Sequence, residues 1–337
     1  MRPVSIVTGF LGSGKTTLIR RVLADPGFAR TAVIVNEFGE IGLDHDIIAS
    51  SSDNLIALST GCLCCAVRGD LVATLLDLAA RRAAGTIPAY DRVLIETSGL
   101  ADPAPILHAL MTDPDVAGSH AIDTVLTLID AVHGEATLDR HPEARRQAAL
   151  ADRLLLTKTD IAGDTAPLRA RLALLNAAAP QLTAIAGRIS PADLFLADLA
   201  PAARFARLAA LPDLPARDPF ARASHTDGIE TFTLYRDRPI PALALAMLLE
   251  ALAEHCGARL LRVKGLVAVA EMADGPALIH GVQHVFSPPV WLESWPTEDK
   301  TTRIVFITQG VPRYFPARLL DAIEAEVLDE TQRETRN

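Results

Sequence analysis

The sequence predicts a doubly wound α/β domain with a mostly parallel sheet, followed by a smaller α+β domain. Short apolar runs alternate with helical stretches through the first half of the chain. A glycine-rich loop at residues 9–16 separates the first of these runs from the first helix. After about Ala186 the composition changes, and a different order of strands and helices follows.

Six apolar runs are expected to form the sheet of the first domain. They are apolar on both faces, as strands are when helices cover both sides of a parallel sheet. The predicted strands are Val4–Thr8, Thr31–Asn36, Asn54–Leu58, Arg92–Glu96, Val125–Ile129 and Arg153–Leu156. Helices are predicted over Thr16–Ala24 and Val67–Ala84, after Pro103 and Pro142, and over Ala166–Ala178.

The change in composition divides the chain into a P-loop domain at residues 1–186, a linker at 187–224 and a C-terminal domain at 225–337. The linker is rich in Ala, Pro, Arg and Asp. Beyond it the sequence predicts the order β-α-β-β-β-α, which indicates a small α+β domain. Its elements are expected at Ile229–Tyr235, Ala242–His255, Leu260–Ala270, Ala277–Phe286, Arg303–Thr308 and Pro316–Val327.

Net charge and hydropathy limit the classes of partner that the protein is expected to bind. The chain has 41 acidic and 32 basic residues, a net charge of −9, and no long basic run. This balance argues against a nucleic-acid partner, which would require a basic face. The longest apolar run, Ile240–Leu249, is too short to cross a bilayer, so no membrane partner is expected. Because no signal-peptide pattern opens the chain, we expect a cytoplasmic protein.

The phosphate loop carries the strongest functional signal. Residues 9–16 read Gly-Phe-Leu-Gly-Ser-Gly-Lys-Thr and fit G-x-x-x-x-G-K-[ST] between a strand and a helix. In such loops backbone N–H groups and the helix N-terminus bind phosphates, while the lysine reaches the β- and γ-phosphates and the hydroxyl ligates Mg²⁺. The residues expected to bind nucleotide here are Gly9, Gly12, Ser13, Gly14, Lys15, Thr16 (also the Mg²⁺ ligand) and Thr17.

A carboxylate that ends an apolar strand should complete the site. Residues 93–99 read Val-Leu-Ile-Glu-Thr-Ser-Gly. Glu96 is expected to hold Mg²⁺ through water or to polarise the attacking water, and Gly99 to donate its N–H to the γ-phosphate. With Lys15, these are the predicted catalytic residues. An ordinary solvated charge at a strand end is the alternative for Glu96.

The segment Thr157-Lys158-Thr159-Asp160 ends the last predicted strand of the domain. GTPases usually carry [NT]-K-x-D at this place, where the aspartate accepts two hydrogen bonds from guanine and the lysine stem covers the base. Adenine does not offer this donor pair, so the motif favours GTP over ATP. Thr157, Lys158 and Asp160 are therefore the expected guanine-binding residues. On its own this short motif is a weak signal.

Three cysteines stand within four positions, in Gly61-Cys62-Leu63-Cys64-Cys65. A disulfide framework would space its cysteines more widely, so the cluster indicates metal or redox chemistry. Three thiolates suit Zn²⁺ or Cu(I) better than Mg²⁺. One short segment leaves a zinc site open, which favours ion transfer over scaffolding. Buried small side chains and redox sensing are the alternatives.

Together these motifs resemble the CobW-type branch of the metal-linked P-loop GTPases of the SIMIBI class, whose relatives include HypB and UreG. Arg262-Val263-Lys264-Gly265 also looks like the C-terminal domain signature of that family. The resemblance covers nearly the whole chain. Its five motifs, in order, are residues 9–17, Asn36-Glu37-Phe38-Gly39-Glu40, residues 61–65, Glu96-Thr97-Ser98-Gly99-Leu100-Ala101-Asp102-Pro103 and residues 157–160.

The resemblance implies a GTP-hydrolysing metallochaperone with GTP, Mg²⁺ and Zn²⁺ (or Co²⁺) as its cofactors. It implies that Cys62, Cys64 and Cys65 bind zinc or cobalt and that a client metalloprotein receives the ion. Glu37 and Glu40, in a segment resembling the switch, would link the nucleotide to that metal; a solvated turn is the alternative. The chain departs from the family in lacking a histidine-rich tract and in starting its guanine motif with Thr157.

Several questions stay open at the level of sequence. A redox-regulated GTPase and an assembly factor for a metalloenzyme, for example in cobalamin synthesis, are alternative functions. His280 and His284, four positions apart, are interpreted as surface or packing residues rather than a second metal site. Cys256 is expected in the core. A homodimer is one option for the assembly state.

Overall fold

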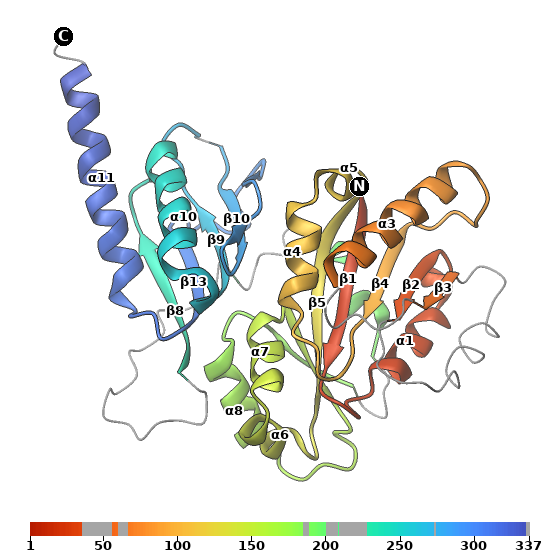
Figure 1. Ribbon diagram of the computed structural model, residues 1–337. Helices are drawn as coiled ribbons and strands as arrows, with labels where there is room; N and C mark the ends of the chain where they lie inside the picture. Colours follow the sequence, from red (N-terminus) through yellow and green to blue (C-terminus); the bar gives the residue numbers. More distant parts are fainter. Residues whose placement is uncertain are drawn as a thin grey trace. The chain divides into compact units, whose positions relative to one another are not determined.

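The structure is a computed structural model that describes residues 1–35, 56–59, 67–184, 189–199, 208, 228–272 and 274–334. The chain forms two compact units (Figure 1). One comprises residues 1–173 and 179–200, and the other residues 174–178 and 201–337. None of the described helices has the length and apolar character that crossing a bilayer requires.

The first unit is built on a seven-stranded sheet in the order β3-β2-β4-β1-β5-β6-β7, in which every strand pair is parallel. Parallel neighbours require crossover connections, and helices supply most of them. The predicted doubly wound α/β class is confirmed. The strands are β1 (Arg2–Gly9), β2 (Thr31–Val35), β3 (Ile56–Ser59), β4 (Arg92–Glu96), β5 (His120–Asp130), β6 (Arg153–Thr157) and β7 (Gln181–Thr183).

Helices cover both faces of this sheet. Val7 and Leu94 pack with Leu18 and Ile19 of α1, and the buried Ile6 and Ile95 alternate with them and point to the opposite face. The helices are α1 (Lys15–Leu23), α3 (Val67–Ala83), α4 (Ala104–Thr112), α5 (Pro114–Ser119), α6 (Gly134–Arg140), α7 (Pro142–Leu150) and α8 (Ala166–Leu175). Short 3-10 turns are η1 (Pro26–Phe28), η2 (Pro191–Asp193) and η3 (Leu196–Asp198).

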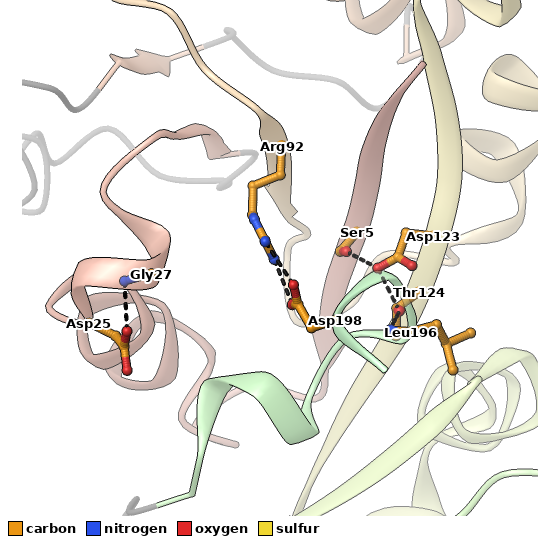
Figure 2. A network of polar contacts seen from close by, with 8 residues as sticks. All are labelled: Ser5, Asp25, Gly27, Arg92, Asp123, Thr124, Leu196 and Asp198. Atoms are coloured by element: carbon orange, nitrogen blue, oxygen red, sulfur yellow. Dashed lines mark hydrogen bonds and ion pairs between the residues drawn. The ribbon is translucent and has the colours of Figure 1, made fainter. Parts of the chain in front are cut away.

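Residues 189–199, which we call the strap, fall within the range assigned to the linker from the sequence, but they pack against the first unit. Its Leu194 and Phe195 are buried in the same cluster as α1. The Arg92 guanidinium makes two hydrogen bonds, of 2.6 and 2.7 Å, to the Asp198 carboxylate of the strap (Figure 2). The strap is therefore held by apolar burial and by an ion pair.

A bulge in β5 supplies the second attachment of the strap. The register of β5 against β1 shifts between Val4 and Ile6, so Asp123 and Thr124 both lie opposite Ser5. Ser5 and Thr124 each donate a hydroxyl hydrogen bond of 2.8 Å to Asp123. Thr124 in turn accepts a hydrogen bond from the Leu196 N–H of the strap (Figure 2). The bulge thus adds polar contacts to the apolar burial and the ion pair that hold the strap.

The second unit is an antiparallel sheet with two long helices, which confirms the predicted α+β class. The strand order is β11-β10-β9-β13-β8, with β12 paired to β10. Residues 277–286, predicted as one strand, form two strands joined at Gln283, whose φ of +52° reverses the chain. The elements are β8 (Ile229–Arg236), α10 (Ala242–Cys256), η4 (Gly257–Arg259), β9 (Leu260–Val267), β10 (Ala277–Val282), β11 (Val285–Phe286), β12 (Val290–Trp291), β13 (Thr302–Gln309) and α11 (Tyr314–Glu334).

Candidate nucleotide and metal site

The glycine-rich loop runs from the end of β1 to the start of α1 in a conformation that only glycine adopts easily. Gly9, Gly12 and Gly14 have φ angles of +139°, +73° and +96°. A Cβ atom at Gly9 would lie 2.4 Å from the Leu128 carbonyl oxygen of β5, so the neighbouring strand excludes a side chain there. At Gly12 and Gly14 a Cβ would meet nothing within 4 Å, which leaves the backbone open to a ligand.

The side chains after the loop turn toward its interior. The buried Lys15 ammonium donates hydrogen bonds to the carbonyl oxygens of Gly9, at 2.9 Å, and Phe10, at 3.3 Å. The Thr16 hydroxyl donates a 2.7 Å hydrogen bond to the Glu96 carboxylate at the end of β4. Because phosphate oxygens can replace carbonyl oxygens around an ammonium group, these contacts leave Lys15 able to bind a phosphate.

The segment after β4 lies directly against the loop. The Thr97 N–H donates to the Val7 carbonyl at 3.0 Å, and its hydroxyl donates to the Thr8 hydroxyl at 2.7 Å. A Cβ atom at Gly99 would lie 2.6 Å from the backbone nitrogen of Leu11, so only glycine fits this approach. The structure thus brings Glu96 and Gly99 to the same edge of the sheet as Lys15.

The guanine motif is tied to the phosphate loop through its first residue. The Thr157 hydroxyl donates a 2.9 Å hydrogen bond to the Ser13 carbonyl. Lys158 follows with a left-handed φ of +58°, and its ammonium forms a 2.7 Å ion pair with Asp130 at the end of β5. Asp160 is exposed in the next turn. All three motif residues therefore lie at the carboxyl edge of the sheet.

Asp130 is a site residue that the sequence analysis missed. Partial burial raises the pKa of its carboxyl group, but hydrogen bonds from Lys158 and from the N–H groups of Val132 and His133, with the charge of Lys158, hold that pKa below its usual value. Asp130 therefore stays ionised and fixes the lysine. A signal was available, because Asp130 ends an apolar strand just as Glu96 does.

The donor set at this edge fits Mg²⁺. Magnesium prefers hard oxygen ligands and keeps several waters, and Thr16 and Glu96 present a hydroxyl and a carboxylate that already meet. The Ser13 hydroxyl is buried and has no hydrogen-bond partner among the described residues, which also suits a polar ligand in the loop.

The residues predicted to bind or sense a transition metal lie in segments that the structure does not describe. Cys62, Cys64, Cys65, Glu37 and Glu40 all lie outside the described residues. In the second unit His280 is half-buried on β10, and His284 is exposed in the turn before β11. No group of three or more potential metal ligands occurs within the described part of the chain. Cys256 is buried, as expected, and burial raises the pKa of its thiol.

A strand, a glycine loop, a helix that starts with Lys-Thr and a buried carboxylate ending a neighbouring strand define a P-loop nucleoside triphosphatase. Residues 3–185 match the family described as "CobW/HypB/UreG, nucleotide-binding domain". Residues 229–325 match the "Cobalamin synthesis protein cobW C-terminal domain". The chain therefore belongs to the CobW/HypB/UreG family and is a P-loop GTPase with a CobW-type C-terminal domain.

Individual relatives agree with this assignment. The zinc chaperone YjiA of Escherichia coli (strain K12) is 34% identical over 309 residues, which is 92% of this chain and 94% of the relative. The zinc chaperone CobW of Pseudomonas aeruginosa is 42% identical over 151 residues, 42% of this chain and 39% of that protein. The crystal structure of Zn(II)-bound YjiA GTPase from E. coli matches with a TM-score of 0.72 at 30% identity, covering 96% of this chain and 98% of that one.

Proposed function

We propose that this protein is a GTP-dependent zinc chaperone that hydrolyses GTP and transfers zinc to a client metalloprotein. The observation that carries the proposal is the meeting of Thr16 with Glu96 beside a loop open at Gly12 and Gly14. The similarity to a zinc chaperone along 92% of the chain supports zinc as the cargo. Since free thiols in a zinc site require a reducing compartment, we place the activity in the cytoplasm.

In this proposal the backbone of Gly9, Gly12, Ser13 and Gly14 holds the phosphates. Lys15 exchanges its carbonyl acceptors for β- and γ-phosphate oxygens, and Thr17 adds a hydroxyl in the first turn of α1. Mg²⁺, when bound at Thr16 and Glu96, would neutralise charge on the β- and γ-phosphates. The open backbone and the oxygen donors of the loop support these roles.

Guanine selection is assigned to the turn after β6. The Asp160 carboxylate would accept hydrogen bonds from guanine, and the Lys158 stem would cover the base plane. The Asp130 carboxylate lies 2.7 Å from the Lys158 ammonium, and this ion pair supports the proposal that Lys158 is fixed beside the base. The 2.9 Å hydrogen bond from Thr157 to Ser13 ties base recognition to phosphate binding.

Hydrolysis is assigned to Glu96 and Gly99. The Glu96 carboxylate polarises or orients the attacking water, and the Gly99 N–H donates to the γ-phosphate, where negative charge develops. The contact of Gly99 with Leu11 supports this role, because it holds that backbone close to the loop. Loss of the γ-phosphate would remove the acceptor of the Gly99 N–H and so end the coupling between this segment and the nucleotide.

Zinc is assigned to Cys62, Cys64 and Cys65, with Glu37 and Glu40 linking the zinc site to the nucleotide. Three thiolates from one segment leave the ion open to transfer. If the triphosphate form completes the site, GTP and zinc must tighten each other by the same factor.

The test is zinc affinity, measured by competition with a chromophoric chelator in the Mg²⁺–GTP-analogue and Mg²⁺–GDP forms. We expect tighter zinc binding in the triphosphate form by about 10-fold or more. The Cys64→Ala variant should lose zinc and keep GTP affinity in metal-free buffer. The matched control is Cys256→Ala, since that thiol is buried in the second unit. Equal zinc affinities in both nucleotide forms would contradict the proposal and favour a redox-regulated GTPase or an assembly factor.

A further inference from the structure

A buried glutamine in α7 contacts the segment that follows Glu96. Gln147 is only 1% exposed. Its side-chain amide donates one hydrogen bond to the Gly99 carbonyl, at 3.2 Å, and a second to the Ala101 carbonyl, at 2.9 Å. One amide group thus bridges two peptide units of the segment assigned to the γ-phosphate.

The chemistry of these contacts fixes the orientation of the amide. Both partners are carbonyl oxygens, which only accept, so the NH₂ end of Gln147 must face them. Its Oε1 is buried and receives no hydrogen bond from any described residue. Leaving that acceptor without a partner costs free energy, which the two hydrogen bonds of the NH₂ group help to offset. What distinguishes the residue is the segment that its NH₂ group holds.

Contacts to the sheet and to the phosphate loop help to hold α7 in place. The Thr127 hydroxyl of β5 donates a 2.9 Å hydrogen bond to the Gln147 backbone carbonyl. At the start of the helix the His141 ring lies against the Phe10 ring of the phosphate loop, with centroids 4.3 Å apart. The position of the helix that carries Gln147 is therefore fixed relative to both the sheet and the phosphate loop.

Gly99 is restrained from two directions. Its backbone approaches Leu11 too closely for a side chain, and its carbonyl is held by Gln147. No described residue accepts a hydrogen bond from the Gly99 N–H. The peptide is thus fixed while its donor stays available, as expected for a group that waits for a phosphate oxygen.

We propose that Gln147 is a positioning residue for GTP hydrolysis, which holds Gly99 and Ala101 in place so that Gly99 can donate to the γ-phosphate. The inference rests on the role of Gly99 in the proposed function. Gln147 acts through the backbone and does not touch the nucleotide. It should therefore affect turnover of GTP, while binding of GDP, which lacks the γ-phosphate, should not depend on it.

The test compares three full-length variants in zinc-free buffer with Mg²⁺. Gln147→Met keeps length and volume but removes both hydrogen bonds. Gln147→Glu places a carboxylate against two carbonyls when ionised and returns one donor when protonated. The control is Gln181→Met, because Gln181 also donates to a backbone carbonyl, that of Arg169 at 2.9 Å, and also leaves its Oε1 without a described partner.

For Gln147→Met we expect kcat to fall about 10- to 100-fold, because a displaced Gly99 N–H would donate less well to the charge that develops on the γ-phosphate. The Kd for GDP should stay within about 2-fold of wild type. The kcat of Gln147→Glu should recover toward acid pH relative to wild type, since protonation restores a donor. Gln181→Met should leave kcat unchanged.

A fall in GDP affinity parallel to kcat, or an equal loss in Gln181→Met, would overturn the inference and reduce Gln147 to a structural residue. An unchanged kcat in folded Gln147→Met would overturn it as well. Zinc affinities decide the chaperone proposal separately, because turnover is measured without zinc. Equal zinc affinities in both nucleotide forms with a kcat loss in Gln147→Met would end that proposal and leave this one standing.

Discussion

The two edges of the first sheet both contain buried or half-buried polar groups, but the groups are satisfied in different ways. At the carboxyl edge Lys15 bonds to the carbonyls of its own loop, and Thr16 bonds to Glu96. Toward the amino edge Arg92 is joined to Asp198 by two hydrogen bonds, and the β5 bulge is joined to the strap (Figure 2).

The contacts at the two edges differ in whether a ligand can replace one of the hydrogen-bond partners. The carboxyl-edge contacts pair a cation with neutral carbonyls and a hydroxyl with a carboxylate, and phosphate or Mg²⁺ can replace either partner with a stronger one. The amino-edge contacts already pair opposite charges or close a local network. Burial alone therefore does not mark a functional group in this protein. A better indication of function is a buried donor whose present acceptor forms a weaker hydrogen bond than the ligand would form.

The largest expected effect follows from removing Lys15. We expect the kcat of GTP hydrolysis in Lys15→Ala to fall at least about 100-fold, as loss of one strong donor to a developing charge usually costs. Unfolding of the nucleotide-free protein should change much less than turnover, since the ammonium bonds there to neutral carbonyls of its own loop. Turnover and thermal unfolding are measured on the same samples.

Lys300→Ala serves as the control, because Lys300 is exposed in the second unit. Should Lys15→Ala unfold at a much lower temperature with little loss of turnover, the contrast between the two edges would be reversed.

The amino edge should respond to pH rather than to nucleotide. His120 is buried beside Tyr90 and Ser119, with hydrogen-bond distances of 3.2 and 2.9 Å. Burial, followed by the positive charges of Arg2 and the N-terminus, lowers the pKa of His120 to about 4. Because the unfolded chain keeps the ordinary value near 6.5, it binds more protons in this range. Stability of the first unit should fall as pH falls from about 6.5 toward 4, by roughly 2 to 3 kcal/mol in total.

Urea unfolding at pH 7, 6 and 5 measures this slope. Burial also raises the pKa of Asp123, which adds the opposite dependence on pH, so the histidine part of the slope is obtained by comparison with a variant. A His120→Asn variant should lose the histidine part of the slope. An identical slope in both proteins would place the pH response elsewhere.

The sequence predicted elements well wherever the apolar pattern was unbroken. β4 has the predicted bounds, Arg92–Glu96, and α3 ends one residue from its expected end. By contrast, β5 begins at His120 rather than at Val125, because the polar residues Asp123 and Thr124 interrupt the apolar pattern and have partners far along the chain. β7 has three residues, too few to give a periodic signal.

The residues of the site also fall into two groups, those that a local motif indicates and those that it does not. Local motifs predicted the phosphate loop, Glu96 and the guanine turn, because each of these depends on residues adjacent in sequence. Gln147 and the strap depend on partners far along the chain, 48 residues from Gly99 and 106 residues from Arg92. A glutamine in a helix and a short segment without regular periodicity carry no local signal for such contacts.

The ion pair between Arg92 and Asp198 gives the next prediction. Both side chains are about one-fifth exposed, the contact is bidentate, and the guanidinium also covers the Phe28 ring at 4.2 Å. A double-mutant cycle with Arg92→Ala and Asp198→Ala should give a coupling free energy of about 1 to 2 kcal/mol in urea unfolding. The kcat for GTP should stay within about 2-fold in each folded variant.

A large loss of turnover in these variants would contradict the separation of the two edges and make the strap part of the active site. The Arg92→Lys variant makes the test more specific, because it keeps the positive charge but lacks the planar guanidinium group that bonds both carboxylate oxygens. It should recover only part of the coupling.

The smallest effect is expected at Thr157, the residue at which the guanine motif departs from the usual pattern of the family. The Thr157 hydroxyl donates to the Ser13 carbonyl at 2.9 Å and so links the guanine turn to the phosphate loop. Thr157→Val keeps the shape and removes this bond, and we expect GTP affinity to fall by about 3- to 10-fold, the loss of one neutral hydrogen bond. Thr157→Asn, which restores a donor, should bind GTP within about 3-fold of wild type. Isothermal titration with GTP and ATP measures both variants, and a gain of ATP binding in either one would show that Thr157 selects the base rather than joining the two loops.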